Sequence, residues 1–534
     1  MALLKERSSV TVDPAAQGEA LPREVRTVAA RDADETLGLE HEFNSEAAAP
    51  PTAKESRRLN RKLYINLILL VCVINLMLFI DKATLGQAVF LGILDDLHIS
   101  DGNYNNLNTL FYTGSGYIIG QLPAQRLIQR LPMSKYVSVT IFIWAVLIFA
   151  HCGATSYGSL IPLRLLLGLV ESGMVPALEM TMGMFFVPHE LHALQPLFWI
   201  SCVGAPIPSG LLSYALLWSK ASVAPWKLFM ITTGGLTLLL AVFSWFWYPD
   251  NPAKARFLTP KERLQVITRV RNATRGSIEQ KTFKKYQFYE ALRDPISWLF
   301  ALAAFALMLA NNLSFQQSLI LLSLGVGNLG STLVTVAGGG FAVACAVVAS
   351  LLMRLFPGYS AWWATLWVLP AIAGSIGMVA LPWDRTIPLL ACLLIAGNTF
   401  ANTYITSLVW TSSSATGYTK KLTRNAMFMI SYGVSNIISP QMWKSGGPRY
   451  YGTWIAQIVV SFCVTPLALH VVRVILKRRN AERKVWIAEQ AVLGNFGDGV
   501  VDSLDAEGNV VQKKVDISVL DLTDLENKFF IYPL

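Results

Sequence analysis

An arginine and a glutamate lie inside an apolar stretch that is long enough to cross a membrane. Arg164 and Glu171 bracket the sequence Arg-Leu-Leu-Leu-Gly-Leu-Val-Glu, and an ionised side chain at the bilayer centre costs at least about 2.5–3.5 kcal/mol. Seven helical residues turn by about 700°, so the two side chains share one face, roughly 10 Å apart. A basic and a protonatable group on one stripe indicate a pathway for an anion and a proton; the alternative is a structural ion pair.

The composition is that of a membrane protein. Of the 534 residues, 53% are hydrophobic and 15% are charged, whereas soluble proteins contain about 25% charged residues. Apolar runs of about 20 residues recur along the chain, which predicts many membrane-spanning helices in a lipid bilayer. The net charge is +10, but basic residues gather between the apolar runs, where they set topology rather than bind nucleic acid. Six scattered cysteines indicate neither a metal site nor a disulfide framework, and we expect no cofactor.

The apolar runs predict an all-α membrane protein with twelve transmembrane helices in two six-helix halves. The expected spans are residues 63–88, 106–127, 136–157, 160–187, 196–218 and 226–248, then 296–320, 331–356, 362–382, 387–410, 423–443 and 452–476. We therefore expect a disordered N-terminal tail (1–60), a first half (61–248), a central loop (249–294), a second half (295–477) and a C-terminal tail (478–534). Two six-helix halves about a central loop are typical of major facilitator transporters.

Basic residues predict the orientation of these spans. Lys and Arg cluster before span one, in the central loop and after span twelve, whereas the first loop on the other side is acidic, with Asp95, Asp96 and Asp101. The positive-inside rule then places both tails and the central loop in the cytoplasm, and we expect the plasma membrane. Within the central loop, Thr259 and Glu262 have the spacing of a capping box, which predicts a short amphipathic helix along the cytoplasmic face.

Other polar residues in the predicted spans extend the candidate site. Lys82 is a candidate ligand for the anion and Asp81 a candidate proton carrier; both lie near the expected outer end of span one, where a lysine could instead reach the interface. Adjacent positions face different directions, so at most one of the two points at the substrate. Glu179 is a further candidate for proton coupling. Neutral amides in the second half complete the candidate substrate ligands: Asn311 and Gln316 in span seven, Asn398 and Asn402 in span ten. Hydrogen bonds between helices are the alternative for these amides.

Several motifs resemble those of the fungal allantoate permease-like family of anion:cation symporters, within the major facilitator superfamily. They are Ile80–Lys82, Arg164–Pro176, Tyr248–Thr259, Phe283–Pro295 and Ser413–Lys421, in a similarity that runs from about residue 60 to residue 480. The resemblance implies the major facilitator fold and carboxylate substrates such as allantoate, nicotinate, biotin or pantothenate, usually carried with protons. Arg164 and Glu171 match residues of the related vesicular glutamate transporters and sialin, which implies carboxylate binding by the arginine and proton coupling by the glutamate.

Two features depart from the usual superfamily pattern. The loop from Gly120 to Arg126 has no acid where a Gly-x-x-x-Asp-Arg pattern is usual, and Gly204–Gly210 in span five is partly similar to a motif of proton-driven drug exporters. No motif of a membrane enzyme is present. We therefore expect a monomer that carries a small organic anion with protons by alternating access; the alternative is an exporter of a secondary metabolite by proton antiport.

Overall fold

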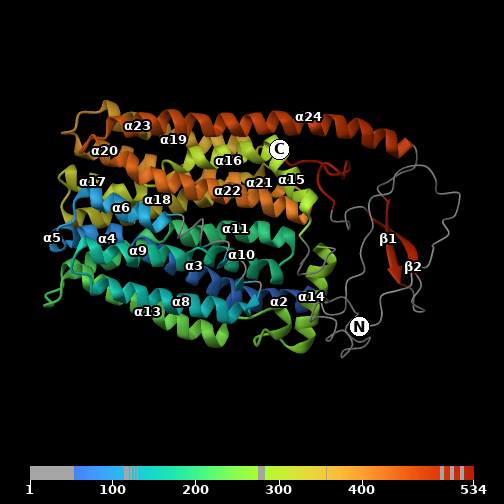
Figure 1. Cartoon of the computed structure of the whole chain (residues 1–534), viewed down its shortest axis with the longest axis horizontal. Helices are drawn as coiled ribbons and strands as arrows, with labels where there is room; N and C mark the ends of the chain where they lie inside the picture. The colour runs from blue at the N-terminus through green and yellow to red at the C-terminus, as the bar shows by residue number, and fades with distance from the viewer. Residues whose placement is uncertain are drawn as a thin grey trace.

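The structure is a computed structural model. It describes residues 53–113, 120, 123–124, 127–128, 130–274, 283–356, 358–492, 498–504, 510–516 and 522–534. The long helices run side by side along one axis of an elongated bundle (Figure 1). One end of the bundle carries α2, α14 and α15, and we call it the basic end; the other carries α5, and we call it the opposite end.

The first half contains six spans in chain order. Its elements are α2 (Ala53–Leu63), η4 (Tyr64–Ile68), α3 (Leu69–Lys82) and α4 (Thr84–Phe90) in span one; α5 (Ile93–Asp96); α6 (Asp101–Tyr112) in span two; α8 (Met133–Cys152) in span three; α9 (Tyr157–Glu171) and α10 (Met174–Phe185) in span four; α11 (Pro188–Val203) and α12 (Pro206–Leu217) in span five; and α13 (Pro225–Trp247) in span six.

Short helices connect this half to the second. They are η5 (Pro252–Lys254), α14 (Pro260–Thr274) and α15 (Lys285–Arg293). The second half then comprises α16 (Pro295–Met308) and α17 (Leu313–Ser323) in span seven; α18 (Asn328–Leu355); α19 (Ser360–Ala380); α20 (Thr386–Asn398) and α21 (Ala401–Ser413) in span ten; α22 (Tyr418–Ile438); η6 (Ser439–Trp443); and α23 (Tyr451–Ala456), η7 (Gln457–Val464) and α24 (Thr465–Val492) in span twelve. An antiparallel hairpin, β1 (Asp498–Leu504) and β2 (Val510–Asp516), follows α24.

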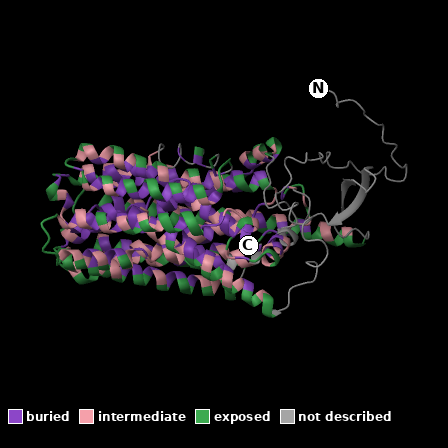
Figure 2. Cartoon of the chain, turned by 90° about the horizontal axis from the view of Figure 1, so that it is seen from below, coloured by how far each residue is buried: buried purple, intermediate pink, exposed green. Residues whose placement is uncertain are grey.

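Ten helices in the described ranges are long and apolar enough to cross a membrane. The other two predicted spans correspond to α6, whose expected span continues into residues 114–119 outside the described part, and to α22, which begins with several basic residues. Figure 2 shows buried residues inside the bundle and exposed ones along its sides. Many exposed side chains there are large and apolar, such as Leu239 and Leu467, which suits a surface in contact with lipid tails.

The basic end differs from the expected boundaries in two places. The helix of span one begins at Ala53, ahead of the expected tail boundary at residue 60, and α24 continues to Val492, past the expected end of span twelve at residue 476. The early start has partners in α14, because Lys261 Nζ lies 3.3 Å from Glu55 Oε1 and Arg269 Nη1 donates to Asn60 Oδ1 over 2.9 Å. Just after it, Lys62 Nζ lies 2.7 Å from Glu262 Oε1. Glu262 also closes a capping box: Thr259 N donates to Glu262 Oε2 over 2.9 Å, and Glu262 N donates to Thr259 Oγ1 over 3.4 Å.

Within the described residues, five spans are interrupted inside the bundle rather than running as single helices. The breaks follow Lys82 in span one, Glu171 in span four, Val203 in span five, Met308 in span seven and Asn398 in span ten. Spans one and seven occupy the same position in the two halves, as do spans four and ten. Interrupted helices at corresponding positions of the two halves mark the binding region in many transporters, because the freed polar groups face a shared cavity.

Hydrogen bonds join the two halves through α4 and α6, toward the opposite end. Tyr104 Oη donates to the carbonyl of Phe315 over 3.0 Å, and Ser318 Oγ donates to the carbonyl of Gly86 over 3.0 Å. Gln441 Nε2 also donates to Thr109 Oγ1 over 2.5 Å. These contacts hold the halves together at the opposite end.

The close approach of α6 and α9 positions the stripe of charged residues on α9. A Cβ added to Gly168, which lies between Arg164 and Glu171, would overlap the carbonyl oxygen of Phe111. We expect Gly168→Ala to separate the two helices, lowering the free energy of unfolding by about 1–3 kcal/mol. Thermal unfolding of the purified protein in detergent measures this. Gly183→Ala is the matched control, because a Cβ at Gly183 meets no atom within 4 Å; equal melting temperatures for the two variants would contradict the prediction.

Candidate functional site

The break in span one places Lys82 against the break in span four. Lys82 Nζ lies 3.8 Å from Glu171 Oε1, and the two residues are only 6% and 1% exposed. The same ammonium group lies over the rings of Tyr112, Phe79 and Phe111, at 4.7, 5.4 and 5.6 Å from their centroids. A buried charge is tolerated only with such partners, so the carboxylate and the aromatic rings together hold the lysine inside the bundle.

Arg164 lies on the same helix as Glu171, toward the opposite end, and is 2% exposed. Tyr104 and Glu171 lie close enough to interact with it electrostatically. Within the described residues, however, Arg164 Nε and Nη2 have no hydrogen-bond partner, and neither has Glu171 Oε2. Buried guanidinium donors without partners are costly and rare, and two such donors on a planar fork match the two oxygens of a carboxylate.

The second half contributes neutral and aromatic groups to the same region. Asn311 Nδ2 donates to Asn436 Oδ1 over 2.6 Å and lies 3.5 Å from Tyr112 Oη. The ring of Tyr432 lies 6.5 Å from that of Tyr112 and 5.5 Å from that of Tyr404. We call Lys82, Arg164, Glu171, Tyr112, Asn311 and Tyr432 the central site. Its cations and its acid come from the first half, and its amide and a second tyrosine come from the other.

Asp81 and Lys82 point to different neighbours. Asp81 is fully buried and accepts a hydrogen bond from Thr237 Oγ1 in α13 over 2.7 Å, whereas Lys82 pairs with Glu171. The expectation that both residues lie near the outer end of span one does not match their position, because α4 continues for seven residues beyond the break. Lys82 therefore does not reach an interface, and its partner is Glu171.

The other predicted amides lie outside the central site. Gln316 is buried beside Tyr450, toward the opposite end. Asn398 Nδ2 donates to the carbonyl of Leu394 over 2.8 Å, and Asn402 Nδ2 donates to the carbonyl of Thr399 over 3.4 Å. These bonds stay within span ten and satisfy its interrupted backbone, so this structure brings only Asn311 of the four amides into contact with the central site.

Glu179 is not part of the central site, but hydrogen bonds connect it to the interface between the two halves. Its Oε2 accepts a hydrogen bond from Gln195 Nε2 over 2.7 Å, and Gln195 Oε1 accepts one from Trp199 Nε1 over 3.1 Å. The ring of Trp199 meets that of Tyr404 edge-on, with centroids 6.2 Å apart. Trp199 belongs to the first half and Tyr404 to the second. These two hydrogen bonds and the ring contact therefore connect a carboxyl group in α10 to an aromatic contact between the halves.

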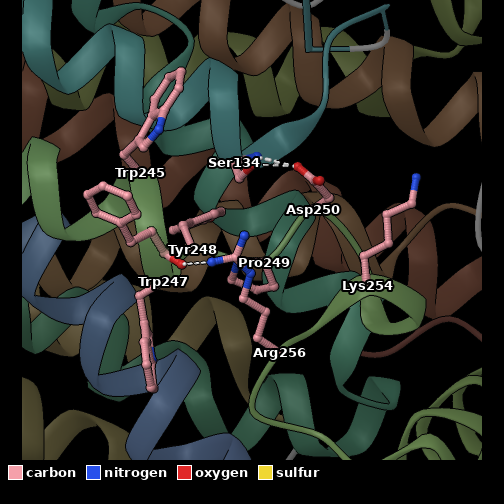
Figure 3. A pocket seen from close by; sticks show the side chains of 9 residues that line it. Ser134, Trp245, Trp247, Tyr248, Pro249, Asp250, Lys254 and Arg256 are labelled. Atoms are coloured by element: carbon pink, nitrogen blue, oxygen red, sulfur yellow. Dashed lines mark hydrogen bonds between the residues drawn. The ribbon is translucent and has the colours of Figure 1, made fainter.

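Figure 3 shows a separate pocket at the end of α13, lined by aromatic residues and by part of the motif after span six. Asp250 Oδ1 accepts hydrogen bonds from Ser134 N and Oγ, over 2.9 and 2.6 Å, and so caps the start of α8. Arg256 Nη1 donates to the carbonyl of Phe246 over 3.1 Å at the last turn of α13. These bonds tie the motif to the ends of spans three and six, which gives it a structural role apart from the central site.

The sequence does not predict Tyr112, a member of the central site, or Tyr404, whose ring packs against that of Tyr432. Tyrosines are common in membrane helices, and nothing in the sequence distinguishes those that face the interior. The contact of Tyr112 with both Lys82 and Asn311 depends on where the break in span one falls. Basic, acidic and amide groups that meet at helix breaks between two halves can bind a small anionic solute and a proton inside a membrane.

The chain matches the family model described as Major Facilitator Superfamily over residues 71–440. It is 53% identical to an uncharacterized transporter of Schizosaccharomyces pombe, over 91% of this chain and 85% of the relative. It is 44% identical to the high affinity cysteine transporter of Saccharomyces cerevisiae, over 95% of this chain and 96% of that protein. The allantoate permease of the same yeast is 27% identical, over 94% of this chain and 90% of the permease.

Solved structures show the same fold at low sequence identity. A bacterial homologue of the human lysosomal transporter Spinster, in an inward-facing and unoccupied conformation, has a TM-score of 0.58 and 16% identity, covering 77% of this chain and 97% of that one. A D-xylose–proton symporter has a TM-score of 0.57 and 15% identity, covering 76% and 97%. These comparisons confirm the predicted fold class and that the chain is a transporter, not an enzyme. The protein is an integral membrane protein of the major facilitator superfamily, in the group of fungal transporters that includes the allantoate permease.

Proposed function

We propose that this transporter carries a small carboxylate-bearing metabolite together with a proton by alternating access. The observation that supports this most is the buried group of Lys82, Glu171 and Arg164 at the breaks of spans one and four. Two cations and one acid leave a net positive site when Glu171 is ionised, and a substrate carboxylate would balance it. Arg164 has two unpartnered donors for that carboxylate within the described residues, and Glu171 is the proton carrier.

An amino acid such as cysteine is the first substrate to test. The relative named as a high affinity cysteine transporter is similar over 95% of this chain, and cysteine carries the carboxylate that the central site favours. Its ammonium group would lie near the tyrosine rings of the second half, whose faces attract cations. Other small carboxylates, including allantoate, are the alternative substrates within the same proposal.

We place both termini in the cytoplasm and the protein in the plasma membrane. The positive-inside rule supports this orientation, because the basic helix α14 and the basic start of α22 lie at the same end of the bundle. Since hydrogen bonds close the opposite end, substrate would reach the central site from the cytoplasmic side in this conformation. The two domains in this proposal are the two six-helix halves, residues 61–248 and 295–477, and each half moves as a unit.

Export by proton antiport is the competing proposal, because of Gly204–Gly210 in span five. The structure gives these residues a packing role. A Cβ at Gly210 would come within 3.1 Å of the carbonyl of Thr332, and one at Gly204 within 3.4 Å of Val343. The glycines thus let span five approach α18 of the other half, as small residues do in membrane helices, and this role is independent of the direction of transport.

Uptake into reconstituted vesicles tests the proposed function. Radiolabelled cysteine should accumulate inside the vesicles above its outside concentration when the imposed proton gradient is directed inward, and excess unlabelled carboxylates that bind the central site should compete. Accumulation only when protons move against the substrate would favour the exporter. If the vesicles transport another carboxylate but not cysteine, the substrate assignment is wrong and the proposed mechanism still holds.

Two neighbouring residues provide a matched test of the central site. Lys82→Gln removes the ammonium group beside Glu171, and we expect at least about a thirtyfold loss of transport, since losing a charged partner in a buried site costs about 2–5 kcal/mol. Asp81→Asn changes the adjacent residue but can keep the hydrogen bond with Thr237, so it should keep most of the transport. Initial uptake rates, normalised to folded protein in the membrane, measure both. A greater loss with Asp81→Asn would move the proton carrier to Asp81.

A further inference from the structure

The last thirteen residues of the chain fold back onto the second half at the basic end. Residues 522–534 lie against α15, α22 and α24, although the sequence predicts a tail for them. Asp524 and Thr523 are fully buried and Tyr532 is 2% exposed. Such burial is characteristic of a bound ligand or a domain core rather than of a solvated tail.

Asp524 completes a buried ion cluster on the helices of the second half. Lys420 in α22 is fully buried, and its Nζ lies 2.8 Å from Asp524 Oδ1, 2.7 Å from Glu290 Oε1 and 3.6 Å from Asp294 Oδ2. Arg424, one turn further along α22, pairs with Asp294 at 2.7 Å. A buried cation of this kind needs its acids, because an uncompensated charge inside a protein is strongly destabilising.

Charge counting shows what the segment supplies. The bundle contributes four cations to this region, Lys420, Arg424, Arg479 and Arg483, and two acids, Glu290 and Asp294. The surface without residues 522–534 is therefore cationic by two charges. Asp524 neutralises one of them, and two carbonyl groups of the segment accept hydrogen bonds from Arg483: its Nη2 donates to the carbonyl of Asp524 and its Nη1 to that of Phe530.

Tyr532 provides the second anchor. Its hydroxyl donates to Asp524 Oδ2 over 2.7 Å, and Arg483 lies over its ring at 4.2 Å. Asn480 in α24 binds its backbone on both sides, since Asn480 Nδ2 donates to the Tyr532 carbonyl and Tyr532 N donates to Asn480 Oδ1, each over 2.9 Å. Hydrogen bonds to the main chain contribute affinity when a protein binds a peptide.

The end of the chain is held as well. Trp410 Nε1 in α21 donates to the carbonyl of Pro533 over 2.9 Å, and Ser360 N at the start of α19 donates to the carbonyl of Leu534 over 3.2 Å. The segment thus contacts four helices of the second half, α19, α21, α22 and α24, and also the connecting helix α15. Burial alone raises the pKa of Asp524, but Lys420 and Arg424 outweigh this effect and hold the pKa below its usual value, so the carboxylate is charged at neutral pH.

Two motifs that carried the family resemblance form the wall of this groove. Gln287, from the motif after the central loop, accepts hydrogen bonds from Thr419 N and Lys420 N, over 3.0 and 3.4 Å, in the motif between spans ten and eleven. Glu290 and Asp294 come from the first motif and Lys420 from the second. Neither motif contributes to the central site, and the groove gives them a shared role.

We propose that the groove between α15, α22 and α24 is a peptide-binding site, and that residues 522–534 are its tethered ligand. The groove selects an acidic peptide with an aromatic residue near its carboxyl end: the acid enters the Lys420 cluster, and the aromatic ring lies under Arg483. Binding rests on these contacts and not on the covalent connection through residues 493–521. The segment therefore stays bound after the connection is cut and exchanges with a free peptide of the same sequence.

A cleavable full-length chain tests this proposal. A site-specific protease sequence is inserted after residue 517, the purified protein is cut in detergent, and size-exclusion chromatography measures how much fragment stays with the bundle. We expect the wild-type fragment to co-elute and a synthetic peptide of residues 522–534 to displace it. The same peptide with Asp524→Asn should need at least about thirtyfold higher concentration, which corresponds to about 2 kcal/mol. This competition uses the wild-type bundle, so it does not depend on the folding of a variant.

Matched changes make the result specific. Glu489→Gln removes an exposed acid from α24 outside the groove and should retain the fragment as well as the wild type does. A peptide with Tyr532→Ala should compete as poorly as the one with Asp524→Asn. Separation of the wild-type fragment directly after cleavage, or equal competition by the wild-type and Asp524→Asn peptides, would overturn the proposal.

Discussion

Arg164→Ala is expected to reduce transport by about thirtyfold to a few thousandfold while the protein still reaches the membrane. The guanidinium group is 2% exposed, and two of its donor nitrogens have no partner among the described residues. A carboxylate bound there makes charge-assisted, two-pronged hydrogen bonds, and truncating one partner of a buried charge pair costs about 2–5 kcal/mol. Initial rates of uptake in reconstituted vesicles, normalised to folded protein, measure the loss.

The lysine variant separates charge from shape. Arg164→Lys keeps the positive charge but loses the planar fork, so transport should be sharply weakened and partly retained. Arg473→Ala is a control, because this half-buried arginine in α24 donates to the carbonyl of Gly358 and lies over the ring of Tyr359, outside the central site, and it should transport normally. Normal uptake by a well-folded Arg164→Ala would exclude Arg164 from substrate binding.

Glu171→Gln is expected to abolish accumulation driven by a pH gradient and to preserve exchange of substrate across the membrane. Glu171 lies 3.8 Å from Lys82 and on the same helix face as Arg164. A substrate anion at these cations offsets their positive field, so a proton on Glu171 becomes easier to keep, and anion and proton load together. Glutamine resembles the protonated carboxyl and cannot release the proton. Counterflow and gradient-driven uptake, measured on the same vesicles, separate the two activities.

Glu179→Gln is the comparison for that experiment. Glu179 accepts a hydrogen bond from Gln195, which in turn accepts one from Trp199, and Glu179 is not part of the central site, so this variant should still concentrate substrate in response to a pH gradient. If Glu171→Gln also concentrates substrate with the wild-type pH dependence, Glu171 is not the proton carrier. Loss of coupling in Glu179→Gln alone would assign that role to Glu179.

Hydropathy and charge placement predict much of the fold, because a bilayer restricts a chain to helices of defined length. The breaks within spans were harder to predict. The backbone turns after Lys82 and after Met308 contain no proline, and their position depends on tertiary contacts that the sequence does not display. The stripe formed by Arg164 and Glu171 could be predicted because it depends only on helical periodicity within one uninterrupted helix, α9.

Partners across helices could not be predicted in the same way. The orientation of each span about its axis decides whether an amide faces a ligand, a neighbour or its own backbone. Asn311 contacts Asn436 and Tyr112, whereas Asn398 bonds within its own helix. The docking of residues 522–534 depends on Lys420 and Arg424 in a different part of the chain, and a short acidic segment after a long helix resembles any solvated tail.

The most direct test of a shared anion and proton site is proton uptake on substrate binding. Titration calorimetry of the purified transporter, in buffers of different ionisation enthalpy at one pH, counts the protons taken up with each bound substrate. The coupling through Arg164 and Glu171 predicts net uptake by the wild type and none by Glu171→Gln, which should still bind substrate. Substrate binding without proton uptake by the wild type, or equal uptake by Glu171→Gln, would contradict it.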